Sequence, residues 1–171
     1  NWTVDVAPAE GVDTIEVEAT SGDGSMASAA FYVEAGGALT VVGGEAKQLV
    51  INGSYTGVGI GAEDGSELSV SGIKIIEPYI GILSGASTMT LTDVDIVTPQ
   101  NLGITYSGDY SANVNVTDVA ITNAVTGFAS ELNEASESAM MITGADELVY
   151  HNNYVSDQHT GAQTVYLEAA Y

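Results

Sequence analysis

The sequence repeats itself, and this repeat limits the possible folds more than any other feature of the chain. TLTDVDI at 90–96 and NVTDVAI at 115–121 share one frame, with Thr-Asp-Val at matching places. The apolar positions of the frame recur in three successive copies, as Leu68, Val70, Ile73 and Ile75, then Met89, Leu91, Val94 and Ile96, then Val114, Val116, Val119 and Ile121. Apolar and polar residues that alternate within a short repeat are typical of stacked β-strands.

Each copy is followed by a polar or Pro-containing corner and then by Gly and an apolar residue, as at Gly81-Ile82, Gly103-Ile104 and Gly127-Phe128. The copies are 21 to 25 residues apart. We therefore expect an all-β fold, a single-domain parallel β-helix (β-solenoid) of about seven rungs with three short strands in each. Rungs about 4.8 Å apart place equivalent residues above one another, so aliphatic side chains should form interior columns.

The length of 171 residues suits one hydrophobic core. Within this single domain, 1–171, we expect an opening coil or cap at 1–38, regular rungs at 39–128, an acidic loop insertion at 129–139 and closing rungs at 140–171.

The charge of the chain is strongly one-sided. It has 23 acidic residues and only two basic ones, Lys47 and Lys74, for a formal charge of −21. Nucleic acid is excluded as a partner, because phosphates are bound through Lys and Arg. A chain with this charge favours cations or a saline medium.

There is no Cys and no apolar run of about 18 residues, so we expect neither disulfides nor membrane insertion.

Asp93 and Asp118 fall at the same place in adjacent copies of the repeat. Two carboxylates about 5 Å apart repel by roughly 1 to 3 kcal/mol, so each needs a cation, a shared proton or a backbone N–H. Two interpretations remain open: an Asp that accepts hydrogen bonds from its own turn, and a calcium ion that bridges the corners. Asp64 and Asp109 lie in Gly-containing acidic loops and are further candidate calcium ligands.

Lys74 aligns with Asp95 on neighbouring rungs, and we expect an outward-facing ion pair worth less than about 1 kcal/mol.

Three sequons mark Asn1, Asn52 and Asn115 as candidate glycosylation sites. A chain that starts at Asn1 without Met is compatible with a secreted protein, so we expect an extracellular or cell-surface location.

The repeats from about 39 to 128 resemble the right-handed parallel β-helix superfamily, which includes pectate lyases, polygalacturonases, and many adhesins and tail spikes. The resemblance implies the fold and transfers no catalytic residue. Lyases of this superfamily use Arg or Lys near calcium, and this chain has no Arg. The Gly-His-Gly and Arg-x-Lys motifs of its hydrolases do not occur here. We therefore expect no enzyme and no organic cofactor, with Ca²⁺ as the only candidate cofactor.

The favoured function is an extracellular structural protein whose subunits assemble into a surface filament or sheath, end to end or by exchange of a terminal strand. The candidate assembly residues lie near the two ends of the chain: Trp2, Val4, Val165, Tyr166, Leu167 and Tyr171.

The alternative function is the binding or cleavage of a neutral polysaccharide. The carboxylates of Asp93, Asp95 and Asp118 would serve glycoside hydrolysis at a separation of about 5 to 10 Å. Aromatic platforms are expected along such a groove, yet tyrosines such as Tyr79 and Tyr106 are predicted near corners.

Overall fold

The chain forms an all-β structure of parallel sheets. The structure, a computed structural model, describes residues 1–5, 11, 13–20, 22–44 and 46–106, together with the strands at 113–122, 126–130, 138–143, 154–155 and 163–168. Every strand pairing that it contains is parallel. A single short 3-10 turn, η1 (Met26–Ser28), is the only helical element among these residues.

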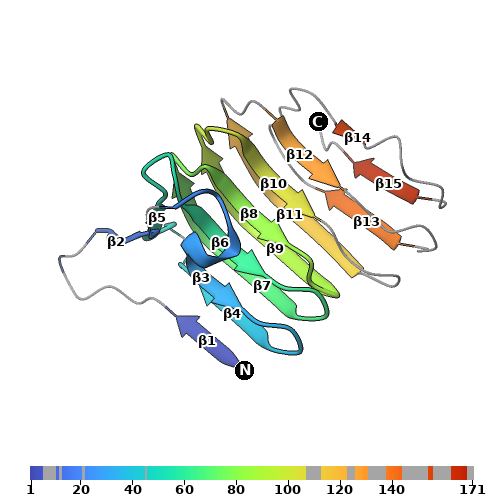
Figure 1. Cartoon of the computed structure of the whole chain (residues 1–171), viewed down its shortest axis with the longest axis horizontal. Coiled ribbons are helices and arrows are strands. Elements are labelled where there is room, and N and C mark those ends of the chain that lie inside the picture. Colours follow the sequence, from blue (N-terminus) through green and yellow to red (C-terminus); the bar gives the residue numbers. More distant parts are fainter. Residues whose placement is uncertain are drawn as a thin grey trace.

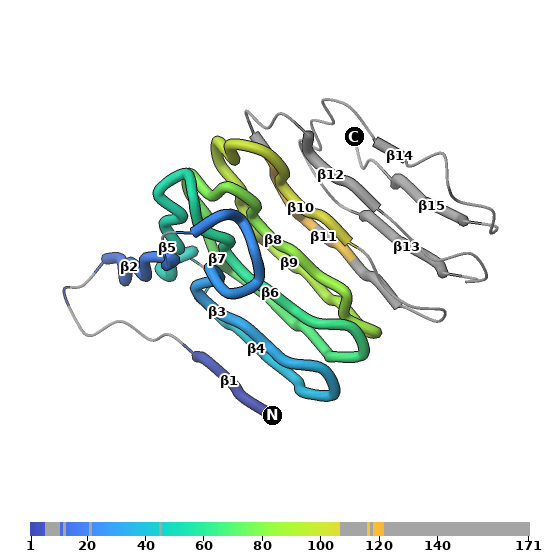
Figure 2. The backbone as a smooth tube through the Cα atoms, viewed as in Figure 1, coloured from blue at the N-terminus to red at the C-terminus, as the bar shows by residue number. Residues whose placement is uncertain are grey.

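The strands form two sheets, which the chain visits in turn (Figure 1). The larger sheet follows the path β1 (Trp2–Asp5), β4 (Ala38–Val42), β7 (Glu67–Ile76), β9 (Thr88–Val97), β11 (Asn113–Thr122), β13 (Ser138–Thr143) and β15 (Gln163–Glu168), with β2 (Ile15–Glu18) and β5 (Leu49–Asn52) beside it. The smaller sheet contains β3 (Ala29–Val33), β6 (Val58–Ala62), β8 (Ile80–Ser84), β10 (Leu102–Tyr106), β12 (Thr126–Ser130) and β14 (Tyr154–Val155). Figure 2 shows the chain crossing from one sheet to the other at each corner between residues 29 and 106.

The pairing register confirms the repeat found in the sequence. Leu68 lies opposite Met89, and Met89 lies opposite Val114. The other apolar positions of the frame follow in step, and Ile82 pairs with Ile104, which pairs with Phe128. A slip of one residue would turn the whole apolar set of a strand toward solvent, so the alternation fixes this register.

The number of strands in a repeat differs from the expected three. Three strands, β4, β5 and β6, are present between residues 38 and 62. In the next repeats, the first two merge into one ten-residue strand, β7 or β9. Val42 pairs with Ser71 and Leu49 with Ile73, so the six residues 43–48 stand opposite Gly72 alone. The later repeats lack this excursion, so a single long strand takes the place of the two short ones.

Aliphatic side chains from both sheets share one core. The four apolar positions of β7 and of β9 are at most 2% exposed, and Ile60, Ile82 and Ile104 of the smaller sheet are at most 1% exposed. Burial of one such side chain contributes roughly 1.5 to 3 kcal/mol. The predicted interior columns are thus present among the described residues.

Glycine at the second position of β6, β8 and β10 lets the two sheets approach each other. A methyl group at Gly59 would lie 2.8 Å from Cγ2 of Ile75, which belongs to the larger sheet. A methyl group at Gly81 would lie 2.8 Å from Cγ2 of Ile96 and would overlap the carbonyl oxygen of Gly103. The glycine column therefore makes room for the isoleucine column that faces it.

Tyr106, the last residue of β10, lies in the interior of the structure. It continues the column of Val33, Ala62 and Ser84 and is fully buried. Its hydroxyl donates a hydrogen bond of 2.7 Å to the carbonyl oxygen of Ala86. Burial, and then the negative charge of Asp64, raises the pKa of Tyr106 to about 12. The small residues around it leave space for the ring, a feature that the alternation alone does not reveal.

The paired strands extend into the segments expected at both ends of the chain. β1, β2 and β3 of segment 1–38 pair with β4, β5 and β6, so the opening segment continues the same sheets. Within the segment 129–139, where an acidic loop is expected, β12 extends to Ser130 and β13 begins at Ser138. Residues 131–137 lie outside the described part of the chain. β13, β14 and β15 continue the parallel pairing of the two sheets.

Replacing Gly81 by Ala should destabilise the protein by roughly 1 to 3 kcal/mol, because the new methyl group overpacks the contact with Ile96. The free energy of unfolding from urea titrations measures this loss. Ser69→Ala, on the outward face of β7, is the control and should stay within about 0.5 kcal/mol of the parent. Equal stability of the Gly81 variant and the parent would contradict the close packing of the sheets.

Candidate functional site

Three equivalent residues in neighbouring long strands share an unusual, left-handed backbone conformation. Gly72 in β7, Asp93 in β9 and Asp118 in β11 occupy equivalent places in the register. Their φ angles are 61°, 55° and 51°, in the left-handed region. Glycine enters this region without strain, and Asp tolerates it better than most residues do. The backbone geometry therefore explains why Gly and Asp, which tolerate this conformation, occupy the column.

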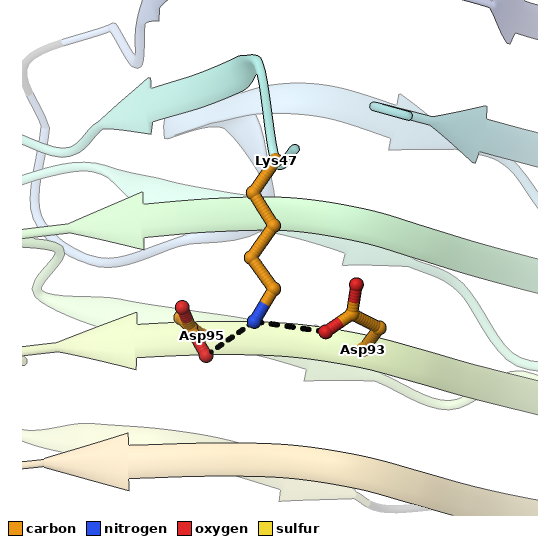
Figure 3. Close-up of polar contacts among 3 residues, drawn as sticks. All are labelled: Lys47, Asp93 and Asp95. Atoms are coloured by element: carbon orange, nitrogen blue, oxygen red, sulfur yellow. Dashed lines mark ion pairs between the residues drawn. The ribbon is translucent and has the colours of Figure 1, made fainter. Parts of the chain in front are cut away.

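Lys47 supplies the cation that the carboxylate of Asp93 requires. Its Nζ lies 2.9 Å from Oδ1 of Asp93 and 2.7 Å from Oδ1 of Asp95. The lysine side chain extends from the 43–48 excursion across β7 to reach both carboxylates on β9 (Figure 3). We refer to these three residues as the lysine clamp.

The excursion 43–48 and the glycine at the bend of β7 build this clamp together. A side chain at Gly72 would overlap the backbone of Gly44, so the loop can pack against the bend only where glycine stands. Burial disfavours the charge of Lys47, but hydrogen bonds and charge attraction from Asp95 and Asp93 outweigh it, so the pKa of Lys47 is raised. The clamp ties the loop to a strand that is two repeats away.

The ion pair expected between Lys74 and Asp95 is not formed, although their register is as predicted. Asp95 pairs with Lys47 instead, and within the described residues Lys47 makes both of the ion pairs. The sequence signal for Lys47 was its scarcity, since the chain has only two basic residues. No feature of the sequence indicates the loop geometry that directs Lys47 to Asp93.

The three candidate calcium ligands that the structure describes do not come together as one site. Asp93 belongs to the lysine clamp, Asp118 is exposed at the next bend, and Asp64 is exposed in the turn between β6 and β7. Asp109 lies outside the described residues. In the part of the chain that the structure describes, no three acidic or histidine side chains are grouped closely enough to hold a metal ion. Calcium therefore stays a prediction.

The N-terminal end of the larger sheet presents apolar side chains at interior positions of the register. Trp2 lies opposite Leu39 and Val4 opposite Val41, so both continue interior columns. Trp2 is nevertheless 79% exposed, and Val4 is half-buried. Among the described strands, β1 has a single neighbour, β4. Trp2 is thus the exposed end of a column whose next three members, Leu39, Leu68 and Met89, are buried.

A pocket of about 540 Å³ lies at the same end of the molecule. Its lining includes Trp2, Tyr32, Glu34, Leu39 and the turn 35–37. Tyr32 is 40% exposed and donates a hydrogen bond to Glu63, which also accepts one from the backbone N–H of Ala35. The hydrogen bond to Glu63 is the main cause that raises the pKa of Tyr32 to about 12. Glu63 therefore fixes both the tyrosine and the turn that form one wall of the pocket.

The candidate glycosylation sites lie in different surroundings. Asn1 is exposed and lines the pocket. Nδ2 of Asn52 donates a hydrogen bond of 2.8 Å to Glu16 across the β2–β5 pair. Asn115 belongs to β11. Glycosylation of any of them remains a prediction, and at Asn52 it would replace one of the two hydrogens of the Nδ2 that donates to Glu16.

The other candidate assembly residues lie at the opposite end of the larger sheet. Val165, Tyr166 and Leu167 belong to β15, the last strand of its path. Tyr171 lies outside the described residues. The first and last strands of the sheet thus carry all the assembly candidates that the structure describes.

Comparisons with protein-family models, with curated proteins and with solved structures gave no match to this chain. The resemblance to the pectate-lyase-like superfamily therefore depends on the repeat pattern alone. Within the described part of the chain, no helix has the length and apolar character needed to cross a membrane.

Replacing Lys47 by Met should lower the free energy of unfolding by up to about 1 kcal/mol at low salt, because the clamp is partly exposed. The loss should shrink at high salt, where exposed charges are screened. Lys74→Met changes the net charge equally and is the control, with little expected loss. Urea titrations at two salt concentrations measure both variants, and an equal loss in both would contradict a specific role of Lys47.

The same pair of proteins gives a pH signature. The pKa of Lys47 is raised above its ordinary value of 10.5 in the folded state. Its stabilising contribution is therefore complete below pH 10.5 and declines as pH rises through the folded-state pKa. The stability difference between the parent and Lys47→Met should shrink above pH 10.5.

Proposed function

We propose that this protein is a β-solenoid of about seven rungs that serves as an extracellular structural protein. The proposal for the architecture is supported by the register, which runs in step through the seven strands from β1 to β15. At about 4.8 Å per strand, seven rungs make a rod on the order of 35 Å long. A short rod with a repeated cross-section suits stacking into a longer one.

The proposed role is that of a subunit in a surface filament or sheath, formed end to end with other copies. One observation carries it: Trp2 occupies an interior position of the register on the first strand and is 79% exposed. An aromatic residue at the open end of a hydrophobic column gains burial when another layer covers it. The unpaired N–H and C=O groups of an edge strand also favour the addition of a strand.

Cations enter the proposal through charge. Subunits with a formal charge of −21 repel one another, and this repulsion must be screened before they stack. Calcium is the proposed cation because it accepts carboxylate oxygens in loose geometry. Asp118, Asp64 and Asp109 are the candidates for it, because Asp93 already has Lys47 as its partner.

Electron microscopy of the purified protein, with calcium and with chelator, tests this function. We expect long uniform fibres, which shorten or disappear in chelator. Trp2→Ser should abolish them while the circular dichroism of the fold is retained, and Thr3→Ser, on the other face of the same strand, is the control. Dispersed rods on the order of 35 Å long in every condition would contradict self-assembly.

The pocket favours a second candidate function, the binding of a neutral glycan. Its two exposed aromatic rings, Trp2 and Tyr32, offer apolar faces for sugar rings, and Glu34 and the turn 35–37 offer hydrogen-bonding groups. Every ionisable side chain in the lining is neutral or acidic, which disfavours acidic sugars. Cleavage of the glycan is not part of this candidate.

Because Trp2 is the only tryptophan of the chain, its fluorescence reports directly on the pocket. Titration with a panel of neutral oligosaccharides should change the emission in a saturable way, and Tyr32→Ala should weaken the response. Thr92→Ala, at an exposed position on β9, three strands from β1 in the larger sheet, is the control. A flat response across the panel would contradict glycan binding.

A further inference from the structure

The two ends of the larger sheet match each other in register. Val165 of β15 pairs with Met140, and Met140 pairs with Val114 in the column that leads to Leu39 and Trp2. Leu167 likewise belongs to the column that ends at Val4. The same two columns therefore run through the sheet from its last strand to its first, and these two strands lie at opposite ends of the sheet (Figure 1).

We infer that β15 of one copy pairs in parallel with β1 of the next, with Val165 beside Trp2 and Leu167 beside Val4. This inference rests on the proposed self-assembly and specifies its joint. The joint continues the interface that already links successive strands of this sheet, with the same direction and the same alternation. It joins two different surfaces, so the contact repeats without closing and generates a filament.

The register also defines a condition for the joint. It places Asp5 and Glu168 side by side, in the outward column that contains Val42, Ser71 and Thr92. Two carboxylates at adjacent places in neighbouring strands repel each other. Assembly should therefore need salt or a divalent cation, and Asp5→Asn should lower the salt concentration that it requires. Asp13→Asn, an exposed residue outside the joint, removes the same charge and should leave the requirement unchanged.

Cysteine cross-linking tests the register directly, because the chain has no cysteine of its own. Thr3 and Tyr166 fall side by side in the proposed joint, and neighbouring strands about 4.8 Å apart suit a disulfide. We expect a mixture of the single variants Thr3→Cys and Tyr166→Cys to form linked pairs under mild oxidation. The double variant should form a ladder on a non-reducing gel.

The matched control pairs Thr3→Cys with Thr164→Cys, which lies about 6.8 Å further along the strand and should link at least tenfold less. Asp5→Cys with Glu168→Cys is a second in-register pair in case the first variants do not fold. Burial of Trp2 in the joint should shift its emission to the blue as fibres grow.

The outcomes separate this inference from the function on which it rests. Preferential linking of the in-register pairs, with a blue shift of Trp2, supports the joint. Fibres that form without these links, or with preferential linking of the Thr164 control, overturn the joint and leave self-assembly intact. Dispersed rods without links overturn both, and a Trp2 response to neutral glycan alone assigns this end of the molecule to ligand binding.

Discussion

Parallel stacking in register is the constraint on which the rest of the structure depends. Each strand of the larger sheet lies beside its equivalent in the next repeat, so one apolar column fixes the position of every layer. Because side chains alternate between faces, the columns allow no slip of one residue. The glycines at 59 and 81 follow from the same constraint, since the facing isoleucine column occupies the space of a side chain there. A substitution in one layer therefore changes the packing of the layers next to it.

The bend of the long strands links backbone geometry to electrostatics. Gly72 accepts the packing of the excursion 43–48, and Asp93 in the next strand takes the same left-handed conformation. The excursion then brings Lys47 to Asp93 and Asp95. Asp93 thus has two roles, because it tolerates the left-handed backbone conformation and also forms an ion pair with Lys47. In a chain with two basic residues, this contact neutralises charge where two carboxylates of one strand stand close together.

The end of the sheet poses the opposite physical problem. Inside the sheet, the inward apolar side chains of β4, β7 and β9 are buried, whereas Trp2 carries its column into solvent. Apolar burial favours the addition of another layer, and the charge of −21 opposes it. The proposed assembly and the proposed binding of a neutral glycan are two ways to cover the same exposed ring. Both depend on the surroundings of the molecule as much as on its fold.

The sequence by itself determined the parallel pairing, the register of the columns and the place of Asp93 beside Asp118, because alternation and repeat length are local properties. It also predicted apolar residues at both ends of the larger sheet. Tertiary structure decided the partner of Asp93, since Lys47 reaches it only through the fold of a loop 46 residues away in the chain. It likewise decided that Tyr106 is buried and that the excursion between two short strands stands opposite Gly72. These outcomes depend on space between layers, which a single repeat of the sequence does not encode.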